Sequence, residues 1–175
     1  IFAASMTSQA NRRYFIDSVR YWVGHDTKIV VDNDRTNEKE CEDEQKAIDD
    51  IEKELSVDIP RFLYRPEGPE FKDYNISKDF EYALLQYDYN DTIMTLYINK
   101  YDKETKSTGA SLDGKEIETI KLPEGEASIQ VKRIMAKGDK KASYVAYWNN
   151  STEFYQIESQ MEEKEFIKLI KNIKF

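Results

Sequence analysis

Histidine and cysteine carry much of the nucleophilic and metal chemistry of proteins, and this chain has one of each, His25 and Cys41. His25 follows Gly24 in a predicted turn, and no nucleophile that it could activate stands near it in the sequence. Cys41 lies among acidic residues, which disfavour the reactive thiolate. We therefore predict neither a triad nor a cysteine–histidine pair. A single cysteine also excludes a disulfide within the chain.

Acidic side chains are numerous but scattered, and none of the usual site motifs organises them. Asp32, Asn33 and Asp34 resemble the opening of a calcium loop, but Asn37 stands where the loop needs glycine and Asp43 where it needs glutamate. Glycine-rich phosphate loops, paired CxxC spacings and HExxH are absent. We predict no metal site, no cofactor and no enzymatic activity. A cell-envelope hydrolase that uses two carboxylates in a cleft stays open as an alternative, because nothing in a sequence excludes such a pair.

The charge of the chain indicates which partners to expect. The formal net charge is −8, and the 26 lysines and arginines are interleaved with the 34 acidic residues. A protein that binds nucleic acid needs a clustered basic surface, so we predict no nucleic-acid partner.

Tyrosine is frequent, with 12 residues, and many of them fall in predicted strands. Tyrosine suits strands because its ring packs while its hydroxyl reaches water, which explains the abundance without any function. An aromatic face that binds a ligand is the functional interpretation. The candidate contacts with a protein or small-molecule ligand are Tyr82, Tyr97, Tyr147 and Trp148.

Hydrophobic residues at spacings of three and four predict three helices. The first covers residues 7–23, with Phe15, Val19, Trp22 and Val23 on one face, and the second covers residues 40–55. The third begins after a capping box formed by Ser159 and Glu162 and carries the stripe Phe166, Ile167, Ile170 and Ile173. A short β-branched run at residues 27–32 predicts a strand between the first two helices.

The period changes to two from Phe71 onward. Residues 80–89 and 92–101 predict a hairpin around Asn90 and Asp91. Further strands are predicted at residues 115–122, 127–135, 142–148 and 153–158. Strands segregated from helices indicate an α+β fold rather than a parallel sheet. We predict one domain over residues 1–175, in which an antiparallel meander of about six strands is packed by N-terminal, middle and C-terminal helices on one face.

Two stretches of the chain carry a family resemblance. The first is residues 10–15 (ANRRYF) leading into residues 27–32 (TKIVVD), and the second is residues 146–150 (AYWNN), 154–157 (FYQI) and 163–171. This pattern resembles a Firmicute family of unknown function, number 4367. The resemblance implies an extracytoplasmic domain of single-span membrane proteins, some of them similar to anti-sigma factors or their outer sensor domains, and it implies no functional residues.

These observations predict a non-enzymatic sensing or ligand-binding domain, and the resemblance implies that it lies on the extracellular side of a bacterial membrane. No run of about 20 apolar residues occurs in the sequence, so the expected tether lies upstream. Residues 1–6 are interpreted either as the stub of a removed membrane segment or signal peptide, or as an ordinary helix start. A lipid or lipoprotein carrier is a further alternative. The sequence predicts neither the identity of the partner nor the oligomeric state.

Overall fold

The computed structural model describes residues 37–66, 70–90, 92–100, 114–122, 127–135, 138–150 and 152–175, with side chains from Asp43 onward. The predicted helix at residues 7–23, the predicted strand at residues 27–32, His25 and the side chain of Cys41 lie outside this part of the chain.

The first described element is the helix α2, Asn37–Leu55, which confirms the helix predicted at residues 40–55. Its apolar stripe, formed by Ala47, Ile48, Ile51 and Leu55, is buried. The helix ends where Ser56 adopts a left-handed backbone conformation with φ of 52°. There the Lys100 ammonium donates a hydrogen bond of 3.1 Å to the carbonyl oxygen of Leu55, which satisfies one of the acceptors that a helix end leaves free.

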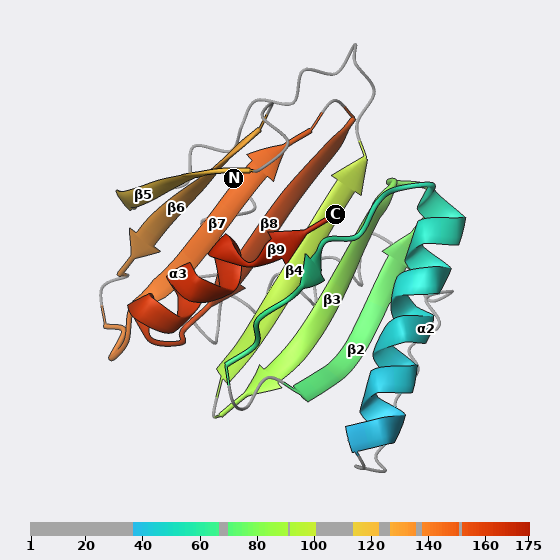
Figure 1. Cartoon of the computed structure of the whole chain (residues 1–175), viewed down its shortest axis with the longest axis horizontal. Coiled ribbons are helices and arrows are strands. Elements are labelled where there is room, and N and C mark those ends of the chain that lie inside the picture. The colour runs from blue at the N-terminus through green and yellow to red at the C-terminus, as the bar shows by residue number, and fades with distance from the viewer. Residues whose placement is uncertain are drawn as a thin grey trace.

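A seven-stranded antiparallel sheet forms the centre of the molecule (Figure 1). Its strands are β2 (Glu70–Ser77), β3 (Tyr82–Tyr89), β4 (Thr92–Lys100), β5 (Lys115–Lys121), β6 (Ser128–Ile134), β7 (Ser143–Asn149) and β8 (Glu153–Ser159). Their spatial order is β2-β3-β4-β8-β7-β6-β5. A separate two-stranded sheet pairs β1 (Arg61–Phe62) with β9 (Ile173–Lys174).

The predicted α+β class and the antiparallel pairing are confirmed, whereas the single meander of about six strands is wrong. The sheet consists of two meanders, β2-β3-β4 and β5-β6-β7-β8, which meet where β4 pairs with β8. Strand β2 was not predicted because a register shift between Phe71 and Asp73 interrupts the alternation that marks a strand.

The last helix, α3, spans Glu163–Lys171 and buries Phe166, Leu169 and Ile170. The predicted capping box is wrong. Ser159 ends strand β8, and its hydroxyl accepts a hydrogen bond of 3.2 Å from the backbone N–H of Met161. Glu162 is the N-cap residue instead, and its side chain makes no capping hydrogen bond.

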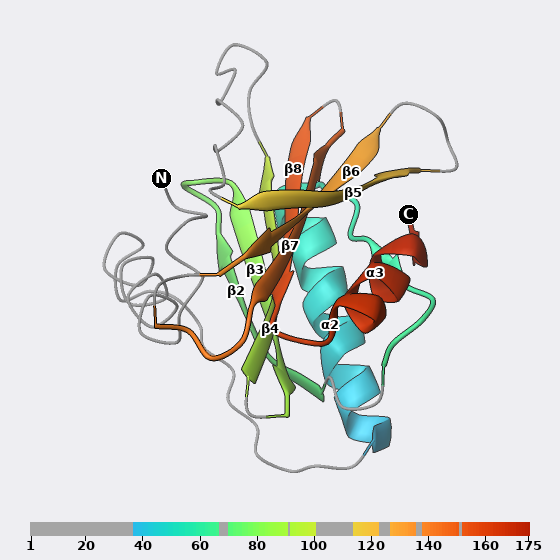
Figure 2. The same cartoon turned by 90° about the vertical axis from the view of Figure 1, so that its left-hand side faces the viewer.

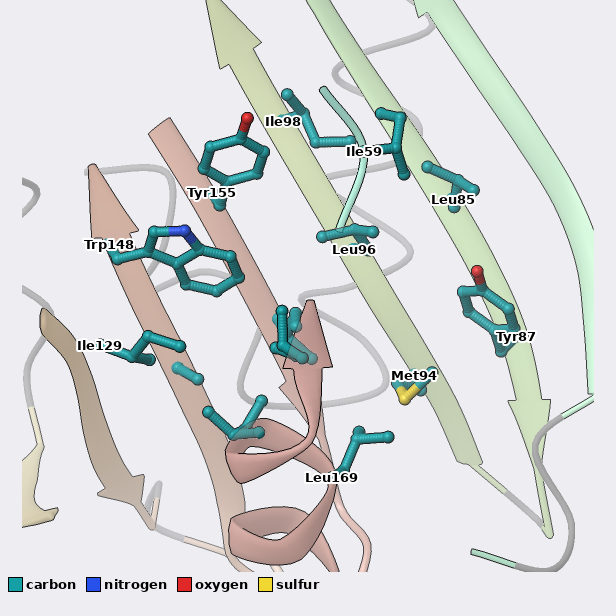
Figure 3. Close-up of a cluster of buried hydrophobic side chains, with 14 of the residues drawn as sticks. Ile59, Leu85, Tyr87, Met94, Leu96, Ile98, Ile129, Trp148, Tyr155 and Leu169 are labelled. Atoms are coloured by element: carbon teal, nitrogen blue, oxygen red, sulfur yellow. The ribbon is translucent and has the colours of Figure 1, made fainter. Parts of the chain in front are cut away.

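Both described helices lie on the same side of the sheet (Figure 2). We call this side the helix face and the opposite side the far face. The core lies between the helix face and the two helices, where alternate residues of the strands point toward Leu169 of α3 and Ile59 (Figure 3). Labelled members of this core include Leu85, Tyr87, Met94, Leu96, Ile98, Ile129, Trp148 and Tyr155. Both α2 and α3 therefore contribute buried residues to this core.

Candidate functional site

The four predicted contact residues do not form one cluster. Tyr82, Tyr97 and Tyr147 point to the far face, because they alternate with core residues of β3, β4 and β7. Trp148 follows Tyr147 directly in β7 and therefore points to the helix face. The structure brings Tyr82 and Tyr97 into contact and separates Trp148 from both.

Trp148 is a core residue. Its ring stacks on Tyr155 at 5.1 Å with an interplanar angle of 9° (Figure 3). Phe175 packs edge-on against it at 6.2 Å. The Tyr155 hydroxyl donates a hydrogen bond of 2.8 Å to the carbonyl oxygen of Asp58. The indole N–H of Trp148 is buried and has no hydrogen-bond partner among the described residues. With only 2% of its surface exposed, Trp148 stabilises the fold and offers no contact area to a ligand.

An aromatic ladder crosses three neighbouring strands of the far face. The Tyr82 and Tyr97 rings lie 5.8 Å apart, and Phe154 of β8 packs edge-on against Tyr97 at 6.3 Å. Tyr82 is buried, whereas Tyr97 and Phe154 are partly exposed. The sequence prediction missed Phe154, although its place in β8 two residues before Gln156 puts it on the same face as Tyr97.

The hydroxyl groups of the ladder are poorly solvated. Burial raises the pKa of Tyr97 to about 12. Burial, and then the neighbouring Tyr97, also raise the pKa of Tyr82. The Tyr82 hydroxyl has no hydrogen-bond partner within the described part of the chain. A buried hydroxyl without an acceptor is energetically unfavourable.

Tyr147 lies on the far face but apart from the ladder. Gln156 stands between Tyr97 and Tyr147 in the strand register. The Tyr147 hydroxyl donates a hydrogen bond to the side-chain oxygen of Gln130, and the Lys132 ammonium lies 5.6 Å from the centre of its ring. These contacts hold Tyr147 in place within its own part of the sheet.

A buried band runs beside the ladder. In the strand register Thr95 of β4 stands opposite Glu158 of β8, which stands opposite Val145 of β7. Their exposed fractions are 3%, 1% and 0%. Ile134 of β6 and Leu84 of β3 are buried on the same face. A solvated face of an antiparallel sheet carries exposed polar residues, so this band is an interior surface that combines apolar side chains with a carboxylate.

The other concentration of polar groups lies on the helix face and fixes α2 to the sheet. The Arg65 guanidinium donates two hydrogen bonds, of 2.8 and 2.5 Å, to the carboxylate of Glu44. The Tyr87 hydroxyl donates a third, of 2.7 Å, to the same carboxylate. Arg65 also lies over the rings of Phe62 and Tyr87. Donors of the protein itself satisfy the Glu44 carboxylate. We therefore interpret Glu44, Arg65 and Tyr87 as a structural cluster, which we call the clamp.

Two further properties of the described residues concern metal binding and membrane insertion. Among the described side chains, no three histidine, cysteine, aspartate or glutamate residues stand close enough together to hold a metal ion. No helix in the described ranges has the length and apolar character needed to span a membrane.

Comparison with known proteins identifies the chain at the level of its family. No curated protein and no solved structure matches it. A family model does match, over residues 59–173, a range that begins before β1 and includes the seven strands of the central sheet as well as α3. The chain therefore belongs to the family described as Domain of unknown function (DUF4367).

Proposed function

We propose that this protein is a non-enzymatic binding or sensing domain, displayed on the outer side of a bacterial membrane by a tether upstream of the domain. The aromatic ladder of Tyr82, Tyr97 and Phe154 is the observation that carries the proposal. It combines two partly exposed rings with a buried hydroxyl that lacks a described hydrogen-bond partner. Aromatic rings with a polar end are typical of surfaces that bind ligands.

The edges of the sheet favour binding through a face rather than by addition of a strand. Strands β2 and β5 are the two edges, and each contains a register shift. Both also carry charged residues, such as Lys72 and Asp73 in β2 and Glu116 and Glu118 in β5. Bulges and charges at edge strands discourage pairing with another chain. The partner, a protein or a small molecule, would therefore contact the ladder.

The extracytoplasmic location belongs to the same proposal and rests on the resemblance to outer domains of single-span Firmicute proteins. Some of those proteins resemble anti-sigma factors, so a role in signalling across the membrane is the corresponding biological hypothesis. A protease-accessibility assay on intact cells tests the location. Digestion of the domain without lysis is expected, and complete protection would contradict it.

Site-specific photocrosslinking in cells tests the binding surface. A photoreactive phenylalanine analogue at position 97 is expected to give a discrete crosslinked product. The same analogue at position 175 provides the control, because Phe175 is an exposed aromatic residue packed against Trp148 on the helix face. Phe154→Ala is expected to weaken the product at position 97. No discrete product at position 97, or equal products at both positions, would contradict the proposal.

A further inference from the structure

The outer side of α3 carries a row of exposed lysines. Lys164, Lys168 and Lys171 are spaced by four and three residues, so they share one side of the helix. The buried Phe166 and Ile170 lie on the opposite side of α3, against the core. The row therefore points away from the sheet, on the side of the molecule opposite the far face (Figure 2).

The β1–β9 pair extends this row. Ile173 is buried and pairs with Phe62, so the neighbouring residues Lys174 and Leu63 point outward by strand alternation. Leu63 is 68% exposed, the largest exposed fraction among the large hydrophobic residues that the structure describes. Lys174 is exposed as well. We use the term lysine surface for Leu63, Lys164, Lys168, Lys171 and Lys174.

Most charges of the lysine surface are available to an external partner. The Lys171 ammonium lies 2.5 Å from the Glu118 carboxylate, which neutralises it in part. The other three lysines form no ion pair with any carboxylate of the described residues. Lys168 instead lies over the ring of Tyr64, 3.8 Å from its centre, and this contact leaves the positive charge uncompensated.

The two described helices differ in charge, and the difference concentrates positive charge at α3. Helix α2 contains nine acidic and three basic residues. Helix α3 contains three lysines and two acidic residues, Glu163 and Glu165. Both acidic residues lie in the first turn, where they complement the helix dipole, and neither belongs to the lysine row. A negatively charged partner would therefore meet attraction at α3 and repulsion at α2.

We propose that the lysine surface docks on an anionic phospholipid bilayer, with Leu63 entering the boundary between headgroups and acyl chains. Each lysine near a negatively charged membrane surface adds to binding. An apolar side chain among the lysines adds a short-range contact that a bilayer satisfies. An acidic protein segment would engage the lysines but leave Leu63 in water, so the combination favours a bilayer.

The net charge of the protein makes this docking dependent on the lysine surface. At −8 the chain as a whole is repelled by an anionic bilayer. Salt screens charges beyond about 10 Å at 0.1 M ionic strength, so acidic residues far from the contact oppose it only weakly. Any preference for anionic lipid must therefore arise from a local positive surface.

This inference goes beyond the proposed function and rests on it only for the biological setting, the outer side of a bacterial membrane. Docking through the lysine surface would turn the far face, with its aromatic ladder, away from the bilayer. The crosslinking experiment probes the ladder and a vesicle experiment probes the lysine surface. Failure of one would therefore leave the other proposal intact.

Vesicle flotation of the full chain tests the docking. Vesicles with equal parts of phosphatidylglycerol and phosphatidylcholine are expected to carry several-fold more protein than vesicles of phosphatidylcholine alone, and high salt should abolish the difference. The double substitution Lys164→Glu and Lys168→Glu is expected to lower the bound fraction several-fold. Lys46→Glu with Lys53→Glu is the matched control, because it makes the same charge change at two exposed lysines of α2. This control should bind like the unmodified chain.

A second pair of substitutions isolates the apolar contribution. Leu63→Ser leaves the charge unchanged and is expected to lower the bound fraction several-fold. Phe80→Ser is its control, because Phe80 is 47% exposed and lies in the turn between β2 and β3, outside the lysine surface. Urea denaturation verifies that all variants stay folded, as expected for exposed side chains. Equal binding of Leu63→Ser and the unmodified chain would overturn the insertion of Leu63.

Four outcomes would overturn the docking as a whole. Two of them are equal flotation with both kinds of vesicle, and equal losses in the α2 and α3 double variants. The third is binding of soluble polyphosphate without binding of vesicles, which would assign the lysine surface to an anionic polymer. The fourth is self-association that the α3 double variant abolishes, again without vesicle binding. That result would assign the lysines to the acidic α2 of a second copy of the chain.

Discussion

The two faces of the central sheet are buried in different ways. On the helix face, apolar residues such as Leu96 and Ile157 pack against α3 and the segment that follows α2, and the polar groups there are joined in the clamp of Glu44, Arg65 and Tyr87. On the far face, the buried side chain of Val145 lies beside that of Glu158, which in turn lies beside that of Thr95. The helix face is therefore a conventional core, whereas the far face has the mixed character of an interface.

This difference suggests a division between side chains that stabilise the fold and side chains that form the proposed binding surface. Side chains on the helix face are fixed by several elements at once, so changes there should unfold the protein. Side chains of the ladder are held mainly by neighbouring strands, so changes there should affect recognition more than folding. The predictions below test this division.

The largest expected effect is the loss of a core aromatic residue on the helix face. Phe166 of α3 is fully buried and its ring lies 5.9 Å from that of Tyr144. Phe166→Ala should lower the free energy of unfolding by about 3–5 kcal/mol. Phe154→Ala, in the ladder, should cost about 1–2 kcal/mol because this side chain is already partly exposed. Urea denaturation measures both, and equal losses would remove the distinction between the two faces.

Removal of the clamp carboxylate should have the next largest effect. Glu44→Ala leaves the Arg65 guanidinium and the Tyr87 hydroxyl without their acceptor. We expect a loss of about 2 kcal/mol in unfolding free energy. Glu44→Gln is the control, because its amide oxygen still accepts a hydrogen bond, and it should cost less. If the two substitutions have the same effect in urea denaturation, the hydrogen bonds of the clamp contribute little.

Tyr97 on the far face should make the stability of the protein decrease at alkaline pH. Burial raises the pKa of Tyr97 from 10.0 to about 12, so the folded state favours the neutral phenol. Its stabilising contribution is present below pH 10 and is lost as the pH rises toward 12. Tyr97→Phe removes this ionisation and should reduce the loss of stability over that range. Denaturation midpoints of both proteins across the range measure the effect, and parallel pH profiles would contradict it.

The smallest effect is expected at the exposed margin of the sheet. The Lys72 ammonium lies 2.7 Å from the Asp88 carboxylate, and both side chains are substantially exposed. Asp88→Asn should change the free energy of unfolding by about 0.5 kcal/mol or less, because water and salt screen such a pair. Thermal denaturation at low and high salt measures this change. A loss comparable to that of Glu44→Ala would show that the margin is as important as the clamp.

Local patterns in the sequence predicted much of this fold. The hairpin of β3 and β4 is confirmed, with Asn90 at φ of 50° in its turn. The two-residue period is also observed in β4, where Met94, Leu96 and Ile98 are all core residues. The helix α2 and its buried stripe were also predictable, because helical spacing of apolar residues is a local property.

Contacts between distant segments were not predictable in the same way. The register shift in β2 interrupts its alternation, so that strand was not predicted. The capping box predicted at Ser159 is wrong because strand β8 continues through this residue. In the candidate site, the sequence identified Tyr82 and Tyr97 as tyrosines on strands but grouped them with Trp148, which the structure places in the core. Phe154 was missed because its contact with Tyr97 depends on the pairing of β4 with β8.

The sequence by itself determined the period of each segment, and with it which residues of one strand or helix share a side. This information is local, because successive side chains of a strand alternate between the two sides for stereochemical reasons. Only the tertiary structure decided that β4 lies beside β8 and that α2 and α3 cover the same face. These choices depend on how much apolar surface distant segments bury against each other, a sum over the whole molecule that no single stretch of sequence contains.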